Sequence, residues 1–359
     1  MPNYEDRQAS VLRKLARSRL DALLLTQMVN IRYLCGFTGS SAAMVLTRSG
    51  KEFYTDGRYD QQSRTEVVGV KKIVIEANPL LRALDALKRG KTKSLGLDFA
   101  HLAVASFQQI EHQLGKRVKF KDCSGMIEGL RAIKDADEIS KIRSAVNLGA
   151  ALFPTALKHI RPAARESQIA AEIEYEARRR GAEGMSFETI VAGGTRSALP
   201  HGRATNQRLP KRGFVVLDFG VILTGYCSDM TRTVHVGKAD AGASRMYGAV
   251  LRAQLAAIKK VGPGVAVSAV DAAARGVLDR AGFGQYFTHS TGHGVGLEIH
   301  EVPRIASGQS QKLQPGMVIT VEPGIYVPGV GGVRIEDMVL VTDRGREVLT
   351  PTTKKLITI

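Results

Sequence analysis

The sequence is poor in cysteine and in long apolar runs. Its three cysteines, Cys35, Cys123 and Cys227, are far apart and form neither a C-x-x-C pair nor a zinc-ligand spacing. We therefore expect reduced, structural thiols and no disulfide framework. No stretch approaches about eighteen apolar residues, and no apolar segment follows a basic start. These absences argue against membrane association and a secretory signal, and they predict a cytoplasmic protein.

Acidic side chains are scarce relative to basic ones. The chain has 51 Lys and Arg against 34 Asp and Glu, a formal net charge of +17. Such an excess raises the prospect of nucleic acid as a partner. The densest basic patches, at 88–93, 178–180 and 211–212, are separated by acidic residues and carry no interleaved aromatic residues. We interpret them as solvated surface and expect no nucleic-acid partner.

The length of 359 residues favours two domains, because one hydrophobic core rarely grows this large. We place the boundary near residue 125, giving domains 1–125 and 126–359. The first shows alternating helical and strand patterns typical of an α/β fold. Its expected elements are 11–20, 80–87 and 104–114 as helices and 22–25, 43–46, 72–75 and 94–97 as strands.

The second domain is expected to open with a long helix. Asp135 followed by Glu138 matches a capping box ahead of an apolar stripe. Another helix, with Ile169 and Ile173 on its apolar face, should end at Gly181. After residue 214 the pattern changes to β-hairpins with interposed helices near 246–260 and 270–278, which predicts an α+β domain.

Two hairpins and a glycine-rich segment carry the chemistry. In the first hairpin, a turn centred on Leu223-Thr224 would place Asp218 directly opposite Asp229, with β-carbons about 4.5 to 5.5 Å apart. Two buried carboxylates at that distance must share a proton or bind a cation. In the second hairpin, Glu322 and Glu336 are symmetric about Gly329.

His293 lies between the hairpins, framed by Gly292 and Gly294, which allow the backbone to approach a site closely. Taken singly, each such residue is more often structural than functional. Four carboxylates and one imidazole together suit two divalent first-row metals with a bridging water or hydroxide. Hydrolysis of an amide or ester follows from that chemistry.

At these residues the sequence resembles the pita-bread metallopeptidases, which include methionine aminopeptidase, aminopeptidase P and prolidase. The resemblance implies that Asp218 holds one metal, that His293 and Glu322 hold the other, and that Asp229 and Glu336 bridge both. It also implies that Glu322 handles the proton of the bridging water. The expected cofactors are two divalent ions, manganese first, with cobalt or zinc as alternatives.

Outer residues resemble the proline-specific branch of that family. These are His201, His289, His300, Tyr326 and Arg334. His289 and His300 are expected to donate hydrogen bonds to the substrate carbonyl and the oxyanion, and Arg334 to orient Asp229 or another bridging carboxylate. Segments 30–40 and 54–59 resemble the creatinase-type, ribonuclease H-like N-terminal domain of the same branch, which implies a homodimer.

The resemblance implies an exopeptidase acting on Xaa-Pro bonds in peptides or dipeptides. Aminopeptidase P accepts longer peptides, whereas prolidase accepts dipeptides and needs a cation to hold the C-terminal carboxylate. Arg304 resembles such a carboxylate clamp and is equally consistent with a surface arginine. Segment 36–40 and the compact length favour an aminopeptidase P, with prolidase as the alternative.

Two other classes of function remain open. Some pita-bread relatives have lost their metals and bind proteins or nucleic acids, and the net charge of +17 would suit such a binding module. The intact set of ligands argues against it. A creatinase-like amidinohydrolase is the third option, but metal-free members of that kind replace ligands that this chain keeps.

Overall fold

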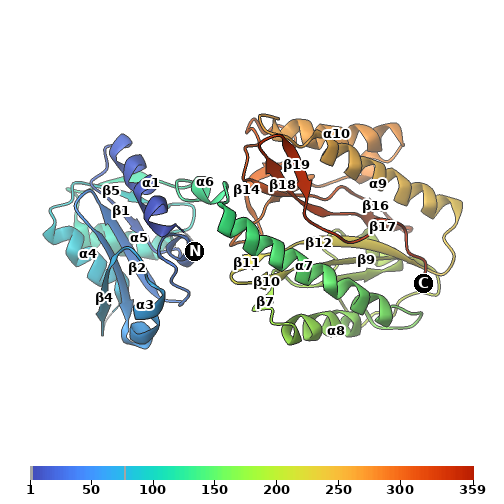
Figure 1. Ribbon diagram of the computed structural model, residues 1–359, viewed down its shortest axis with the longest axis horizontal. Coiled ribbons are helices and arrows are strands. Elements are labelled where there is room, and N and C mark those ends of the chain that lie inside the picture. The colour runs from blue at the N-terminus through green and yellow to red at the C-terminus, as the bar shows by residue number, and fades with distance from the viewer. Residues whose placement is uncertain (1–2, 77) are drawn as a thin grey trace. The chain divides into compact units, whose positions relative to one another are not determined.

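The computed structural model describes residues 3–76 and 78–359 and divides the chain into two compact units, Met1–Arg131 and Ala132–Ile359 (Figure 1). Helix α6 (Glu128–Arg131) closes the first unit. It is held there by the Asn30 side chain, which donates to Glu128 at 2.7 Å and accepts from Arg131 at 2.9 Å. The first unit therefore extends through the whole of this short helix.

The first unit is an α/β domain built on a six-stranded sheet of order β4-β3-β2-β1-β5-β6. Its strands are β1 (Ala22–Leu25), β2 (Ala42–Thr47), β3 (Lys51–Asp56), β4 (Lys71–Ile75), β5 (Ser94–Leu97) and β6 (Lys119–Asp122). Its longer helices are α1 (Tyr4–Arg17), α2 (Met28–Cys35), α3 (Asp60–Glu66), α4 (Pro79–Arg89) and α5 (Val104–Leu114).

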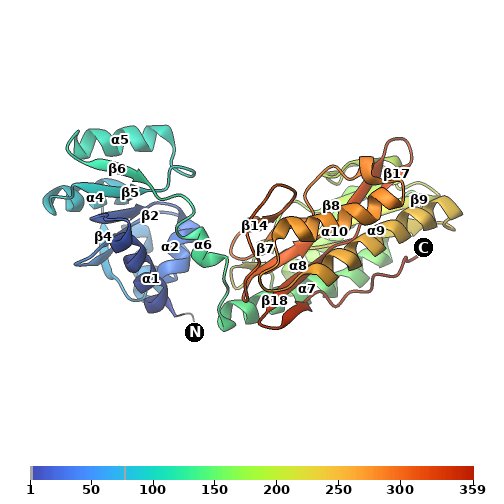
Figure 2. The same ribbon diagram turned by 90° about the horizontal axis from the view of Figure 1, so that it is seen from above.

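Strand β1 lies in the middle of this sheet and is buried on both faces. Ala22 and Leu24 join the core under α4 and α5, and Figure 2 shows α1 and α2 on the other side of the sheet. An all-apolar strand is what a position covered by helices on both faces requires. The predicted strands 22–25 and 94–97 and the predicted helix 104–114 are confirmed with those bounds.

The second unit combines two helix pairs with short, mainly antiparallel sheets, as the pita-bread prediction requires. Its helices are α7 (Ala136–His159), α8 (Glu166–Arg179), α9 (Ala241–Lys260) and α10 (Val267–Arg280). Its strands are β7 (Gly184–Met185), β8 (Ile190–Gly193), β9 (Gly213–Phe219), β10 (Val221–Leu223), β11 (Tyr226–Cys227), β12 (Met230–Val236), β13 (Gly292–Gly294), β14 (Glu301–Ile305), β15 (Val318–Val321), β16 (Gly324–Val327), β17 (Gly331–Arg334), β18 (Asp337–Thr342) and β19 (Gly345–Val348).

Each helix pair covers its own group of strands, and the site lies between the two groups. Helices α7 and α8 pack against β8, β10 and β11, whereas α9 and α10 pack against β14 to β17. The capping box at Asp135 and Glu138 is present, and Gly181 ends the α8 segment with φ of +94°. Within the described residues, no helix is both long and apolar enough to cross a membrane.

Candidate metal centre

The first hairpin carries Asp218 on β9 and Asp229 just before β12, but its register differs from our prediction. Asp218 pairs with Thr231, not with Asp229, and the turn is centred on Thr224-Gly225. Both turn residues have positive φ, +49° and +82°, as a type I′ hairpin turn requires. Because directly paired residues of antiparallel strands point to one face, Asp218 and Thr231 lie on the same face of the hairpin.

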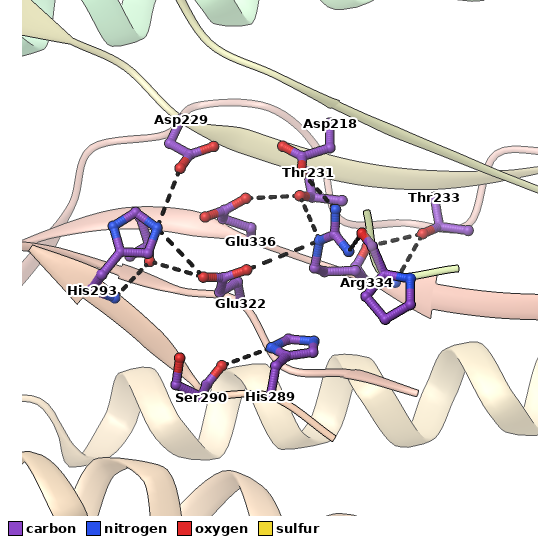
Figure 3. A network of polar contacts seen from close by, with 12 residues as sticks. Asp218, Asp229, Thr231, Thr233, His289, Ser290, His293, Glu322, Arg334 and Glu336 are labelled. Carbon is purple, nitrogen blue, oxygen red and sulfur yellow. Dashed lines mark hydrogen bonds and ion pairs between the residues drawn. The ribbon is translucent and has the colours of Figure 1, made fainter. Parts of the chain in front are cut away.

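The second hairpin has the predicted register. Gly324 pairs with Arg334 and Val321 with Asp337, so the ladder is symmetric about Gly329. Glu322 lies between β15 and β16, and Glu336 lies between β17 and β18. Figure 3 shows their carboxylates turned toward Asp218, Asp229 and His293. The five candidate ligands therefore come together from three separate segments.

His293 presents a lone pair to two carboxylates. Its Nδ1 lies 3.0 Å from the carbonyl oxygen of Gly294, and because a carbonyl only accepts, Nδ1 carries the proton. Nε2 is 3.6 Å from Asp229 Oδ2 and 3.5 Å from Glu322 Oε1. Burial lowers the pKa of His293 to about 4, so the ring is neutral at pH 7. A lone pair facing two acceptors calls for a cation between them.

The carboxylates themselves are incompletely satisfied. Asp218 Oδ1, Asp229 Oδ1 and Glu336 Oε1 are buried and have no hydrogen-bond partner among residues 3–76 and 78–359. Burial, followed by repulsion from neighbouring carboxylates, raises the pKa values of Asp229 and Glu336 well above their usual range. Burial is also the main cause of the raised pKa of Glu322.

This donor set fits divalent cations. Ligand atoms of Asp229, His293 and Glu336 lie within 4.8 Å of one another. Carboxylate oxygens and a neutral imidazole whose second nitrogen donates to a carbonyl are the usual first-row metal ligands. Positive charge would also offset the cost of burying several carboxylates side by side.

Arg334 is buried, which excludes a surface role, and it bonds a different carboxylate from the one we expect. Its Nη2 donates to Asp218 Oδ2 at 2.5 Å, not to Asp229. Its Nε donates to Thr231 Oγ1 at 3.1 Å, and that hydroxyl donates to Glu336 Oε2 at 2.7 Å. Arg334 therefore contacts Asp218 directly and Glu336 through Thr231.

Sequence reasoning missed Thr231, although a signal was present. Thr231 lies two residues after Asp229, and alternation along β12 places both side chains toward the same side. A hydroxyl there can accept from the arginine and donate to the carboxylate, which no apolar residue can do.

The outer residues fall into two groups. Tyr326 is buried, accepts from Arg334 at 2.7 Å and lies 2.9 Å from His289 Nε2. His289 Nδ1 faces the carbonyl oxygen of Ser290 at 2.8 Å, so Nε2 is the acceptor for the Tyr326 hydroxyl. Burial lowers the pKa of His289 to about 4 and keeps it neutral. The geometry therefore does not support the predicted role of His289 as a donor to the substrate carbonyl.

His201, His300 and Arg304 are exposed. The His300 ring is 4.4 Å from that of His293, and burial is the main cause that lowers the pKa of His300. Arg304 on β14 is paired with His293 on β13, and directly paired antiparallel residues point to one face. Arg304 thus lies beside His293.

Fold and site together define a class, that of two-domain proteins with a carboxylate-rich centre suited to divalent metals. Residues 140–343 match the model of metallopeptidase family M24, and residues 7–133 match the creatinase/prolidase N-terminal domain. The chain belongs to metallopeptidase family M24, and the predicted enzyme class, a metallo-exopeptidase, is confirmed.

Relatives cover the whole chain. A solved structure described as an Xaa-Pro dipeptidase from Bacillus anthracis superimposes with a TM-score of 0.96 at 37% identity, covering 99% of this chain and 100% of the other. A Pyrococcus horikoshii protein named Xaa-Pro dipeptidase is 34% identical over 99% of this chain and 100% of its own. An X-Pro aminopeptidase from Thermotoga maritima gives a TM-score of 0.89 at 33% identity, covering 96% and 100%.

Proposed function

We propose that this protein is an Xaa-Pro dipeptidase, the alternative that the sequence left open. The names of the relatives support this alternative better than the aminopeptidase P that the sequence favoured. The position of Arg304 is the observation within the chain that carries the proposal. A guanidinium beside His293 can bind the C-terminal carboxylate of a dipeptide in bidentate fashion, and a longer peptide has no carboxylate at that place.

The proposal assigns the ligands as the resemblance implies. Asp218 would hold one metal, His293 and Glu322 would hold the other, and Asp229 and Glu336 would serve both. Bound divalent metals would polarise the scissile carbonyl and make water a stronger nucleophile. We expect manganese, with cobalt or zinc as alternatives.

The chain's own groups supply the remaining steps. Glu322, whose carboxylate lies 3.5 Å from His293 Nε2, takes the proton of the attacking water and passes it to the leaving proline nitrogen. His300 donates a hydrogen bond to the developing oxyanion. Arg334 and Thr231 hold the carboxylates of Asp218 and Glu336 in place.

The test compares Ala-Pro, Ala-Pro-Ala and Ala-Ala-Ala as substrates of metal-stripped protein with and without added manganese. We expect manganese-dependent hydrolysis of Ala-Pro, much slower hydrolysis of Ala-Pro-Ala and none of Ala-Ala-Ala. Comparable rates on both proline peptides would make the protein an aminopeptidase P instead. The variant Asp229→Ala should remain folded and lose both metal binding and turnover.

A further inference from the structure

A second charged network, made by Arg232, Asp337 and Lys354, adjoins the candidate metal centre through Asp337, which follows Glu336 in the chain. Glu336 lies just before β18 and Asp337 is the first residue of that strand. Consecutive side chains of an extended chain point to opposite sides, Glu336 toward the candidate metal ligands and Asp337 away from them. Asp337 is fully buried and pairs with Arg232 at 2.7 Å. Neither residue belongs to the ligand set.

Arg232 uses all of its hydrogen-bond donors. A guanidinium has five N–H groups, and five oxygens accept from this one. Nη1 donates to the carbonyls of Thr231 and Glu336, and Nη2 to Asp337 Oδ1 and the carbonyl of Thr352. Nε donates to the carbonyl of Thr353 at 2.9 Å. The buried guanidinium of Arg232 therefore bonds to β12, to Glu336 and Asp337 at the start of β18, and to residues 352 and 353 near the end of the chain.

The C-terminal tail, residues 350–359, contributes a second cation. Lys354 Nζ lies 2.6 Å from Asp337 Oδ2, which also accepts from Gln254 at 2.8 Å. The tail is fixed on either side of Lys354. Tyr247 donates to the Lys354 carbonyl at 3.1 Å. The backbone N–H of Ile359 donates to the carbonyl of His235 on β12 at 2.9 Å, and its carbonyl accepts from Gly237 at 2.7 Å.

Stability alone does not account for such a network. Removing charges from water is costly, and well-packed apolar residues of similar volume are often at least as stabilising as a buried ion pair. A fully satisfied network does, however, fix the positions of the groups it joins. The groups joined here are the backbones of Thr231 and Glu336, whose side chains meet at 2.7 Å within the centre.

We infer that Arg232, Asp337 and Lys354 are positioning residues for the metal centre. Through them, the C-terminal tail determines how tightly the centre binds metal. The inference rests on the proposed ligand role of Glu336. Outer partners of metal ligands typically change metal affinity by about 10- to 100-fold when they are replaced. Loosening the tail should therefore weaken metal binding although no ligand has changed.

The variant Lys354→Met tests this inference, with Lys355→Met as its control. Lys354 is partly buried against Asp337, whereas its neighbour Lys355 is exposed and has the same charge. Metal-free full-length protein is titrated calorimetrically with manganese chloride, and thermal unfolding of each metal-free variant is recorded. We expect Lys354→Met to bind manganese about tenfold or more weakly, Lys355→Met to match the wild type, and Lys354→Arg to recover most of the affinity.

The outcomes separate this inference from the proposed function. If Lys354→Met unfolds at a lower temperature but binds manganese as the wild type does, the network is merely structural and the inference is overturned. If the wild type itself fails to bind manganese, cobalt or zinc, the proposed metal centre fails first. Equal weakening in both lysine variants would reflect lost positive charge, not positioning, and would also overturn it.

Discussion

At the scale of single residues, the contacts of Thr231 explain more of the centre than its identity suggests. Its hydroxyl accepts from Arg334 and donates to Glu336, so it links the guanidinium of Arg334 to a candidate metal ligand. Loss of an exposed hydroxyl would cost little free energy, because water would replace it. The buried carboxylate of Glu336, in contrast, would keep an unsatisfied charge if Thr231 no longer donated to it. Thr231 therefore offers a sharper test of the centre than removal of a ligand.

Thr231→Val should lower manganese affinity by roughly 10- to 100-fold, because valine keeps the shape and removes the donor to Glu336. Thr233→Val is the matched control. Thr233 lies on the same strand, and its side chain bonds to the backbone of Arg334, at 2.9 and 3.1 Å. Calorimetric titration of both metal-free variants is the measurement. Equal affinities in the two variants would show that the Thr231 hydroxyl has no role in metal binding.

Arg304 decides substrate length in the proposal, so its removal should act on one substrate and not on another. Arg304→Ala should raise the KM for Ala-Pro at least tenfold, because a charge-assisted pair to the carboxylate is lost. The residual rate on Ala-Pro-Ala should change little. Steady-state kinetics on both peptides make the comparison within one preparation. Equal losses on both would remove Arg304 from the specificity argument.

At the scale of elements, local signals in the sequence predicted helices better than hairpin registers. The capping box at Asp135 and Glu138 is present because both reciprocal bonds involve residues three apart. The first hairpin was misplaced because Thr224, a β-branched residue, adopts a positive φ that its type disfavours. The Arg334 partner was missed for a different reason: Asp218 is 116 positions away in the chain.

The capping box gives a prediction for the stability of helix α7. Asp135→Ala should lower the free energy of unfolding of the second unit by about 1 kcal/mol, because the amide of Glu138 loses its acceptor. Asp137→Ala is the control. It removes the same charge from the same turn, together with a surface pair with Lys141. Urea unfolding followed by circular dichroism suits a chain without tryptophan. Equal losses would mean that charge near the helix end, not the cap, is responsible.

At the scale of the whole molecule, the candidate metal ligands are unevenly distributed between the two units. Every candidate ligand lies between Asp218 and Glu336, within the second unit, whereas the first unit has its own separate core. The length alone suggested two domains, since 359 residues exceed what one core usually supports. The network around Arg232 could not be foreseen, because it joins strand, helix and tail segments that no local pattern connects.

Metal binding should therefore stabilise one unit and leave the other unchanged. A ligand at 100 times its dissociation constant stabilises the folded state by about 2.7 kcal/mol, which slows exchange of globally protected amides roughly 100-fold. With saturating manganese, we expect slower hydrogen exchange in β9, β12 and β15 to β18, because the cation relieves repulsion among the carboxylates that these strands carry. Strands β1 to β6 should exchange at their metal-free rates.

Hydrogen-exchange mass spectrometry of full-length protein, with and without manganese, measures both units at once. Asp229→Ala with manganese is the control and should show no added protection in either unit. Protection of equal size in β1 to β6 would contradict the assignment of the metals to the second unit alone. Protection confined to the second unit in the wild type and absent from the variant would tie the stabilisation to the carboxylate cluster itself, since no other group differs between the two proteins.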